Sequence, residues 1–305
     1  MSEKVSVIYN AYSGLLKPQW KIETLMQRLS EDFGYEVTLI DIAQHDDLEV
    51  VVIQTCLDGA DLVLSCGGDG TAHRVLNGIL KSKKATKMAI VPFGTVNDFA
   101  SVIGMTDDID YFLEILKKNT FRQIDVGKCN DTYFINVVAA GAFTDIGYVV
   151  PRKLKRIFGR FAYYYYGLKD SIKHLNKAYR VKMVINDEVV EKKINLFTVS
   201  NSNSIGGFRN YARPTGVDDG FLYLMVMEKL NFFEAIGIVA NYLATSELKG
   251  DKIKYHYIKH FEISCEKKLV FDIDGEKGEK LPLTIDVIEK CLNLLINEDV
   301  YQPEI

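Results

Sequence analysis

The sequence lacks features that would assign it to several common classes. Its five cysteines are scattered, odd in number and without C-x-x-C spacing, so we expect reduced, mostly buried thiols in a cytosolic protein rather than a disulfide framework. The opening residues show no signal-peptide pattern. The most apolar window, Phe232–Ala244, contains Glu234 and Asn241 and is too short to span a bilayer. These absences predict a cytoplasmic protein that is soluble or peripheral at the inner face of a membrane.

An excess of positive charge is also missing. The formal net charge is −4 over 305 residues, which argues against a general nucleic-acid binder. Hydrophobic residues make up 48% of the chain and charged residues 26%, a composition typical of a globular protein. The length suggests about two domains.

The familiar phosphate-binding motifs do not occur either. There is no G-x-x-x-x-G-K-[ST] sequence, which argues against a Walker-type nucleotide triphosphatase. The dinucleotide fingerprint G-x-G-x-x-G is incomplete, because His73 stands where its third glycine belongs. The segment His73-Arg74-Val75 also lacks the aspartate of a protein-kinase catalytic loop. A phosphate site in this chain must therefore be of another type.

What the sequence does contain is a glycine-rich loop, Gly67–Thr71, between an apolar run and a stretch with helical spacing. We expect its three glycines to let the backbone approach a ligand closely and to adopt positive φ where needed. Peptide N–H groups at such a turn, together with a helix N-terminus, favour an anion such as phosphate. An ordinary strand-to-helix turn is the simpler interpretation, but one glycine usually suffices there. Three glycines around an acid favour a phosphate-binding loop.

The N-terminal part alternates strands and helices. Such alternation predicts a parallel sheet with helices on both faces, and ligands of these sheets bind beyond the carboxyl ends of the strands. Three polar loops directly follow expected strands and are expected to converge there: Asn10–Gly14, Gly67–Thr71 and Gly94–Asp98.

After about Phe121 the pattern changes to many strand-like runs with short polar turns, which predicts an antiparallel sandwich or barrel. We expect an α/β nucleotide-binding domain over residues 1–124 and an all-β domain over 125–284, with the tail 285–305 packed back on the first. The expected helices within the second domain are 153–176 and 232–248. The expected strands are 122–128, 132–140, 180–186, 192–200, 221–228, 254–265 and 268–273.

Two segments together resemble a known family. Gly67–Thr71 reads GGDGT, and Pro92–Ala100 reads PFGTVNDFA. In this order they resemble the diacylglycerol-kinase-type lipid kinases, most closely the soluble bacterial branch. Further matching stretches are Asn10–Gly14, Gly141, Phe143, Gly159–Tyr163, Asp219–Leu222 and Asp274–Glu276. The resemblance covers nearly the whole chain, and it implies the two-domain plan described above.

The resemblance implies an ATP- and Mg²⁺-dependent kinase that phosphorylates the hydroxyl of diacylglycerol or a related lipid in a cleft between the domains. Asp69 and Asp98 would hold Mg²⁺, with Asp69 also among the catalytic residues, although Asp98 would equally suit a helix start. Two other functions stay open, which are a NAD kinase and a non-catalytic lipid- or nucleotide-binding protein. The implied nucleotide-binding residues are Asn10, Ala11, Tyr12, Ser13, Gly14, Gly67, Gly68, Asp69, Gly70, Thr71, Thr95, Asn97 and Asp98.

The resemblance also assigns the catalytic acid/base to Asp274-Gly275-Glu276, after an expected strand. A carboxylate on such a turn can accept the proton of a lipid hydroxyl. The choice between Asp274 and Glu276 stays open. From the residues alone, a type I′ hairpin turn is the simpler interpretation of Asp-Gly.

A second, structural Mg²⁺ site is implied at Gly216, Asp219 and Phe221, the last through its carbonyl. Because Gly216 has no side chain, a side-chain ligand is missing there, and Asp218 is a candidate replacement. The simpler interpretation is an acidic turn before a strand.

Three further features concern partners and activity. The basic run Arg152–Arg160, mixed with aromatic residues, suits an anionic membrane surface as well as a solvated helix face. Edges of the second domain's sheets are candidates for pairing into a homodimer. The family usually continues GGDGT with x-N-E, where this chain has Ala72-His73-Arg74, so a changed nucleotide site or weak activity is expected.

Overall fold

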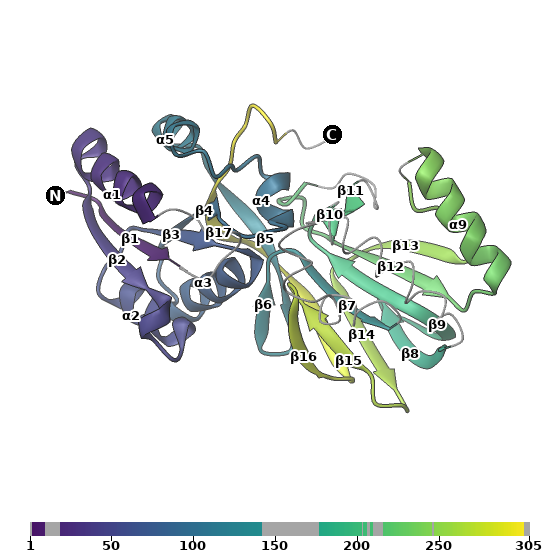
Figure 1. The fold of residues 1–305 in the computed structure, drawn as a ribbon. Coiled ribbons are helices and arrows are strands. Elements are labelled where there is room, and N and C mark those ends of the chain that lie inside the picture. The colour runs from purple at the N-terminus through teal and green to yellow at the C-terminus, as the bar shows by residue number, and fades with distance from the viewer. Residues whose placement is uncertain are drawn as a thin grey trace. The chain divides into compact units, whose positions relative to one another are not determined.

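The computed structural model describes residues 2–9, 19–141, 177–202, 204–205, 208–209, 216–245 and 247–301. The chain divides into two compact units (Figure 1). Unit 1 comprises Met1–Ile124 and Lys290–Gln302, and unit 2 comprises mainly Asp125–Glu289. The predicted loop Asn10–Gly14, the basic run Arg152–Arg160 and the expected helix 153–176 lie outside the described residues.

Unit 1 contains a parallel sheet, as the alternating pattern predicts, and its strand order is β2-β1-β3-β4-β17. Every residue of β3 is buried, which is typical of a strand covered on both faces. Its strands are β1 (Lys4–Tyr9), β2 (Glu36–Asp41), β3 (Leu62–Gly67), β4 (Lys87–Pro92) and the end of β17 (Leu283–Leu295).

The helices of unit 1 pack as two pairs, α1 with α5 and α2 with α3. Local signals set their ends: Asp47 and Asp108 accept backbone N–H bonds at the starts of α2 and α5, and Gly34 follows α1 at φ 69°. Gly78 of α3 allows close packing on α2, because a Cβ there would lie 2.5 Å from Val52 Cβ. The helices are α1 (Gln19–Phe33), the 3₁₀ helix η1 (Ile42–Gln44), α2 (Leu48–Leu57), α3 (Asp69–Ser82), α4 (Asp98–Val102) and α5 (Ile109–Lys118).

Unit 2 is built on antiparallel strands in the order β16-β15-β7-β9-β8-β14-β17, with β12 pairing β9 and β13, and β5 pairing β6 and β17. One helix, α9 (Phe232–Thr245), is described in this unit. The strands are β5 (Phe121–Cys129), β6 (Thr132–Phe134), β7 (Val137–Gly141), β8 (Tyr179–Ile185), β9 (Glu188–Ser200), β10 (Ser204–Ile205), β11 (Phe208–Arg209), β12 (Leu222–Glu228), β13 (Ile253–Ile258), β14 (His260–Cys265), β15 (Val270–Ile273), β16 (Glu276–Lys280) and β17.

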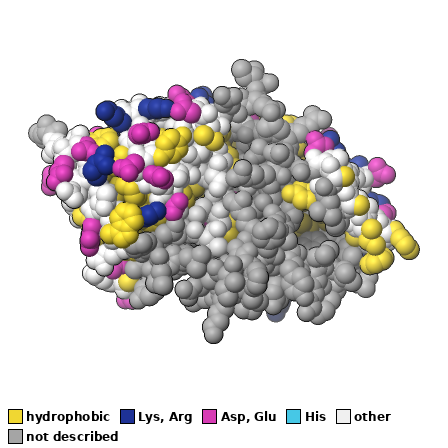
Figure 2. All heavy atoms as spheres, turned by 45° about the horizontal axis from the view of Figure 1, so that its top comes forward, with side chains coloured by type: hydrophobic (Ala, Val, Ile, Leu, Met, Phe, Trp, Pro, Cys, Tyr) yellow, Lys and Arg dark blue, Asp and Glu magenta, His cyan; other side chains and the backbone are white. Residues whose placement is uncertain are grey.

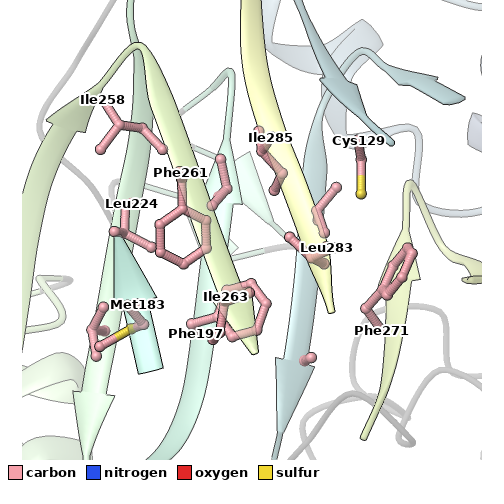
Figure 3. Packing of buried hydrophobic residues seen from close by; sticks show 14 of the residues in the cluster. Cys129, Met183, Phe197, Leu224, Ile258, Phe261, Ile263, Phe271, Leu283 and Ile285 are labelled. Carbon is pink, nitrogen blue, oxygen red and sulfur yellow. The ribbon is translucent and has the colours of Figure 1, made fainter. Parts of the chain in front are cut away.

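The main core of unit 2 lies on one face of these strands (Figure 3). Phe197 of β9 and Phe261 of β14 are fully buried in it, with ring centroids 5.6 Å apart. A smaller cluster on the other face of β12 contains Tyr223, Met225 and Ile238, the last from α9. Alternation along β12 therefore buries both of its faces.

Two strand predictions were wrong in the same way. The runs 132–140 and 254–265 were each predicted as one strand, and each is divided into two strands with different partners. β6 pairs β5 whereas β7 pairs β9 and β15, and β13 pairs β12 whereas β14 pairs β8 and β17. The first break follows from hydrogen bonds described below.

The C-terminal tail forms the single strand β17. Its first part, Leu283–Asp286, pairs β14, and Leu294 pairs Met88 of β4. Lys290, between these parts, has φ 50°, and the chain of unit 1 resumes there, later than the expected 285.

All five cysteines are free, as predicted. Burial raises the pKa of the Cys66 thiol, and burial together with the charge of Glu279 raises the pKa of Cys129 to about 12, which keeps both thiols protonated and inert. Within the described part of the chain, no helix has the length and apolar character needed to cross a membrane.

Candidate active site

The glycine loop joins the end of β3 to the start of α3. Gly67 is the last residue of β3, and a Cβ on it would lie 2.6 Å from Thr71 Cβ. A Cβ on Gly94, in the loop after β4, would lie 2.5 Å from Gly68 Cα. The glycines are therefore required for close packing of two backbone segments. Positive φ is not needed in these loops, because none of these glycines has it.

A hydrogen bond joins the two signature loops. Gly67 pairs with Pro92 across β3 and β4, so the loops leave neighbouring strands at the same edge of the sheet. The Asn97 N–H donates to Asp69 Oδ2 at 3.0 Å, and Asn97 Nδ2 donates to the Gly94 carbonyl at 2.9 Å. Asn97 has φ 51°, which asparagine tolerates well. The acid of GGDGT thus holds the backbone of the second loop.

The remaining predicted residues of unit 1 lie around these loops. Asp69 and Asp98 are both in the first turn of a helix, and Asp98 is buried. Thr71 is also buried, whereas Thr95 is exposed. Two carboxylates beside loops of this kind fit Mg²⁺, which takes one or two carboxylates together with phosphate and water oxygens. Among the described residues no group of three or more His, Cys, Asp or Glu side chains forms a candidate metal cluster.

The departure after GGDGT falls on α3. His73 is buried in that helix, and its carbonyl accepts a hydrogen bond from Asn77 Nδ2 at 2.9 Å. Arg74 is exposed. The added cation is therefore on the solvent side of α3, and the histidine is on the packed side.

Asp274 is held by several backbone hydrogen bonds. It is buried, and it accepts three backbone N–H bonds at 2.9 Å, one to Oδ2 from Ile135 and two to Oδ1 from Asn136 and Val137. Its own N–H donates to the Val137 carbonyl at 2.8 Å. These bonds use the amides between β6 and β7, which explains why the predicted strand 132–140 is divided. A hydrogen bond to a charged group contributes about 1.5–3 kcal/mol, so this turn is firmly held.

The turn itself has the geometry expected from Asp-Gly. Ile273 pairs with Glu276 across the β15–β16 hairpin, and Asp274 and Gly275, between them, have φ 50° and 85°. A two-residue hairpin loop with both φ values positive is a type I′ turn, so the simpler interpretation describes the backbone correctly. Glu276 is half-buried and lies on the same face of the hairpin as the buried Ile273, since paired residues project to one side.

The Gly216–Phe221 turn is held by an acid that the sequence analysis missed. Asp125 of β5 is fully buried and accepts the Gly220 N–H through Oδ2 at 2.6 Å, while its own N–H donates to the Val217 carbonyl. Asp219 Oδ1 accepts the Phe221 N–H at 3.0 Å. Asp125 lies within the run 122–128, which the sequence predicts only as a strand, and no local motif marks it.

Negative charge accumulates at this turn. Partial desolvation raises the pKa of Asp219, and the charges of Asp125 and Asp218 raise it further. Asn201 donates from Nδ2 to the Asp125 carbonyl, and its buried Oδ1 has no hydrogen-bond partner among the described residues. Carboxylate and amide oxygens suit Mg²⁺. The donor set thus fits a hard cation despite the missing side chain at Gly216, and the site stays a prediction.

Comparisons with known proteins cover the whole chain. Residues 4–129 match the family described as "Diacylglycerol kinase catalytic domain", and residues 136–296 match "YegS C-terminal NAD kinase beta sandwich-like domain". A diacylglycerol kinase of Staphylococcus aureus (strain MRSA252) is 31% identical over 306 residues, which is 100% of this chain and 96% of the relative. One from Staphylococcus epidermidis (strain ATCC 12228) is 30% identical over 305 residues, with the same coverage.

Solved structures show the same fold. A diacylglycerol kinase structure from Bacillus anthracis matches with a TM-score of 0.77 at 22% identity, covering 98% of each chain. A second structure from that organism reaches 0.82 at 23% identity and covers 98% of this chain and 96% of the other. The α/β unit and the β sandwich are therefore confirmed. The relatives that match the whole chain at 30–31% identity show the family as well as the fold. The chain belongs to the diacylglycerol kinase family of lipid kinases.

Proposed function

We propose that the protein transfers the γ-phosphoryl group of ATP, with Mg²⁺, to the hydroxyl of diacylglycerol or a closely related lipid. The observation that supports this most is the Asp69–Asn97 hydrogen bond, which holds the two family signatures in one arrangement after adjacent strands. Phosphoryl transfer depends mainly on positioning and on stabilising phosphate charge, and such an arrangement serves both.

Unit 1 provides the phosphate side of the reaction. The start of α3, with glycine at its N-cap, presents backbone N–H groups and the positive end of a helix dipole to an anion. The hydroxyls of Thr71 and Thr95 add donors for phosphate oxygens. Bound Mg²⁺ would neutralise phosphate charge, and Asp69 and Asp98 would hold it directly or through water.

Unit 2 provides the base, and the contacts favour Glu276 over Asp274. Both Asp274 oxygens accept backbone N–H bonds, so this carboxylate fixes the turn. Glu276, two residues further along the chain, is half-buried and lies on the same face of the hairpin as the buried Ile273. In the proposed step the lipid oxygen attacks the γ-phosphorus, its proton passes to the Glu276 carboxylate, and ADP leaves.

The test uses labelled ATP, Mg²⁺ and mixed micelles of diacylglycerol, sphingoid base or other hydroxyl lipids, with label followed into the organic phase. Glu276→Gln should lower kcat by about 100-fold or more, because general-base catalysis contributes that much. Glu279→Gln, an exposed position on the same strand, is the matched control and should retain activity. Label in none of the lipids would refute the proposed function, and an undiminished kcat in Glu276→Gln would refute the assignment of the base.

A NAD kinase is the second candidate, because the sandwich family itself is described by its likeness to NAD kinases. In that reaction the acceptor is a ribose hydroxyl, and the aspartate of the glycine loop serves as base. Formation of NADP⁺ from NAD⁺ and ATP, without labelled lipid, would favour it. The full-length relatives named diacylglycerol kinase favour the lipid.

A further inference from the structure

Helix α9 carries apolar side chains on the face that it turns away from unit 2. Its inner residues Ala235 and Ile238 pack on the smaller core cluster. The outward positions follow helical spacing and are all exposed, with Phe233 82% and Ile236 51% accessible. This outer stripe consists of Phe233, Ile236, Gly237, Ala240 and Ala244. A surface helix normally presents polar residues outward, so the stripe indicates a contact partner.

The outer stripe contains no charged side chain. The one acidic residue of α9, Glu234, takes part in the cap at the start of the helix. The Asn231 N–H donates to Glu234 Oε2 at 2.7 Å, and the Glu234 N–H donates to Asn231 Oδ1 at 2.9 Å. This reciprocal pair is a capping box. Figure 2 shows hydrophobic side chains gathered at the right-hand edge, where α9 lies in Figure 1.

Lysines adjoin the start of α9. Backbone bonds place Lys229 beside Lys193, and Glu228 beside Lys252. Glu228 is the acid among them, and Lys192 and Lys252 lie 3.1 and 4.0 Å from its carboxylate. Lys193 and Lys229 are exposed and make no ion pair with any described residue. This lysine cluster (Lys192, Lys193, Lys229 and Lys252) keeps a net positive charge in a chain whose total is −4.

We propose that the outer stripe of α9 and the lysine cluster dock the protein on an anionic lipid bilayer. Exposed aromatic rings enter the interface between headgroups and acyl chains, while nearby lysines are attracted to anionic lipids. The choice of a bilayer rests in part on the proposed function, since the acceptor lipid resides in one. None of its residues belongs to the basic run Arg152–Arg160.

The test measures sedimentation of the full chain with vesicles of phosphatidylcholine, alone or mixed with phosphatidylglycerol, in the absence of nucleotide. Wild type should bind the mixed vesicles more tightly. Phe233→Ser should weaken that binding about tenfold, the value of one buried aromatic side chain. Lys193→Gln with Lys229→Gln should weaken it about 30-fold on mixed vesicles only, since each lysine contributes about 1 kcal/mol near an anionic surface. Val189→Ser, at an exposed position of the β8–β9 hairpin, is the matched control.

Three outcomes would overturn the inference. They are no binding of wild type to mixed vesicles, equal binding by Phe233→Ser, and a change from dimer to monomer in Phe233→Ser with vesicle binding unaltered. The last would assign the stripe to a second copy of the chain. Because binding is measured without catalysis, its failure is separate from failure of the kinase assay, and Phe233 is too exposed for its replacement to unfold the chain.

Discussion

The two signature loops of unit 1 and the Asp274–Glu276 turn of unit 2 carry the proposed chemistry, and their glycines serve different purposes. In unit 1, Gly67 and Gly94 make room for neighbouring atoms and have ordinary φ values. In unit 2, no atom of the described residues lies within 4 Å of a Cβ added to Gly275, but this glycine has φ 85°. The acids differ as well, since Asp69 accepts the Asn97 N–H whereas Asp274 accepts three backbone N–H groups. A glycine next to an aspartate therefore indicates a special turn without saying which physical reason requires it.

The largest expected effect on stability is at Asp274. An asparagine at position 274 keeps one oxygen acceptor, but its amide NH₂ group faces backbone N–H groups that are themselves donors. Asp274→Asn should therefore lower the free energy of unfolding by about 2–4 kcal/mol. Urea unfolding followed by circular dichroism measures it. Asp272→Asn is the control, because Asp272 Oδ1 accepts the Gly275 N–H and an amide oxygen can do the same. Similar losses in both variants would contradict the special status of Asp274.

This result would also separate the two acids of the turn. If Asp274 positions the turn and Glu276 accepts the proton, Asp274→Asn lowers stability and activity together. Glu276→Gln lowers kcat with little change in unfolding. If both variants lost stability and activity to the same extent, the two acids would not have separate roles.

The next effect concerns the close approach of the two loops in unit 1. Gly94→Ala should lower stability by about 1–3 kcal/mol and reduce activity, because its Cβ would collide with the Gly68 backbone. Gly237→Ala, in α9 with no atom within 4 Å, should instead raise stability by about 0.5–1 kcal/mol. Thermal unfolding measures both, and a neutral Gly94→Ala would show that the loops have room to separate.

Gly275→Ala sharpens the same comparison. No collision is expected there, but alanine is strained at φ 85°, so the loss should be about 1 kcal/mol. Replacing Gly275 by Asn, which tolerates positive φ, should recover part of it. Equal losses for Ala and Asn would indicate that φ is not the reason for this glycine.

The local pattern of the sequence was enough to predict the parallel sheet of unit 1 and the strand runs 180–186 and 192–200, because hydrophobic period is a local signal. The breaks at Ile135–Asn136 and Lys259 were missed. The first depends on Asp274, which is distant in sequence, so no local pattern records it. Strand-forming residues continue across both breaks and predict one strand in each run.

The site shows the same limit. The signature loops and the Asp-Gly-Glu turn were found from short motifs, whereas Asp125 was missed because its role depends on Gly220, a distant partner. Sequence also left Asp274 and Glu276 equivalent. Their difference lies in burial and in amide contacts that only the fold supplies.

The smallest expected effect is at Asp219. It tests whether this carboxylate stabilises the folded chain, as Asp274 does, or destabilises it. Desolvation and neighbouring acids raise the pKa of Asp219, so the folded chain keeps its proton at pH values where the unfolded chain has lost it. Stability from this group is therefore greatest at low pH and falls as pH rises through the interval between the ordinary and the raised pKa.

Asp219→Asn should slightly raise the melting temperature at about pH 7 in chelator, with the difference vanishing near pH 3. Added Mg²⁺ should stabilise wild type more than the variant if carboxylates hold a cation at this turn. A variant that is less stable in chelator at neutral pH would show that Asp219, like Asp274, is stabilised by its amide contacts.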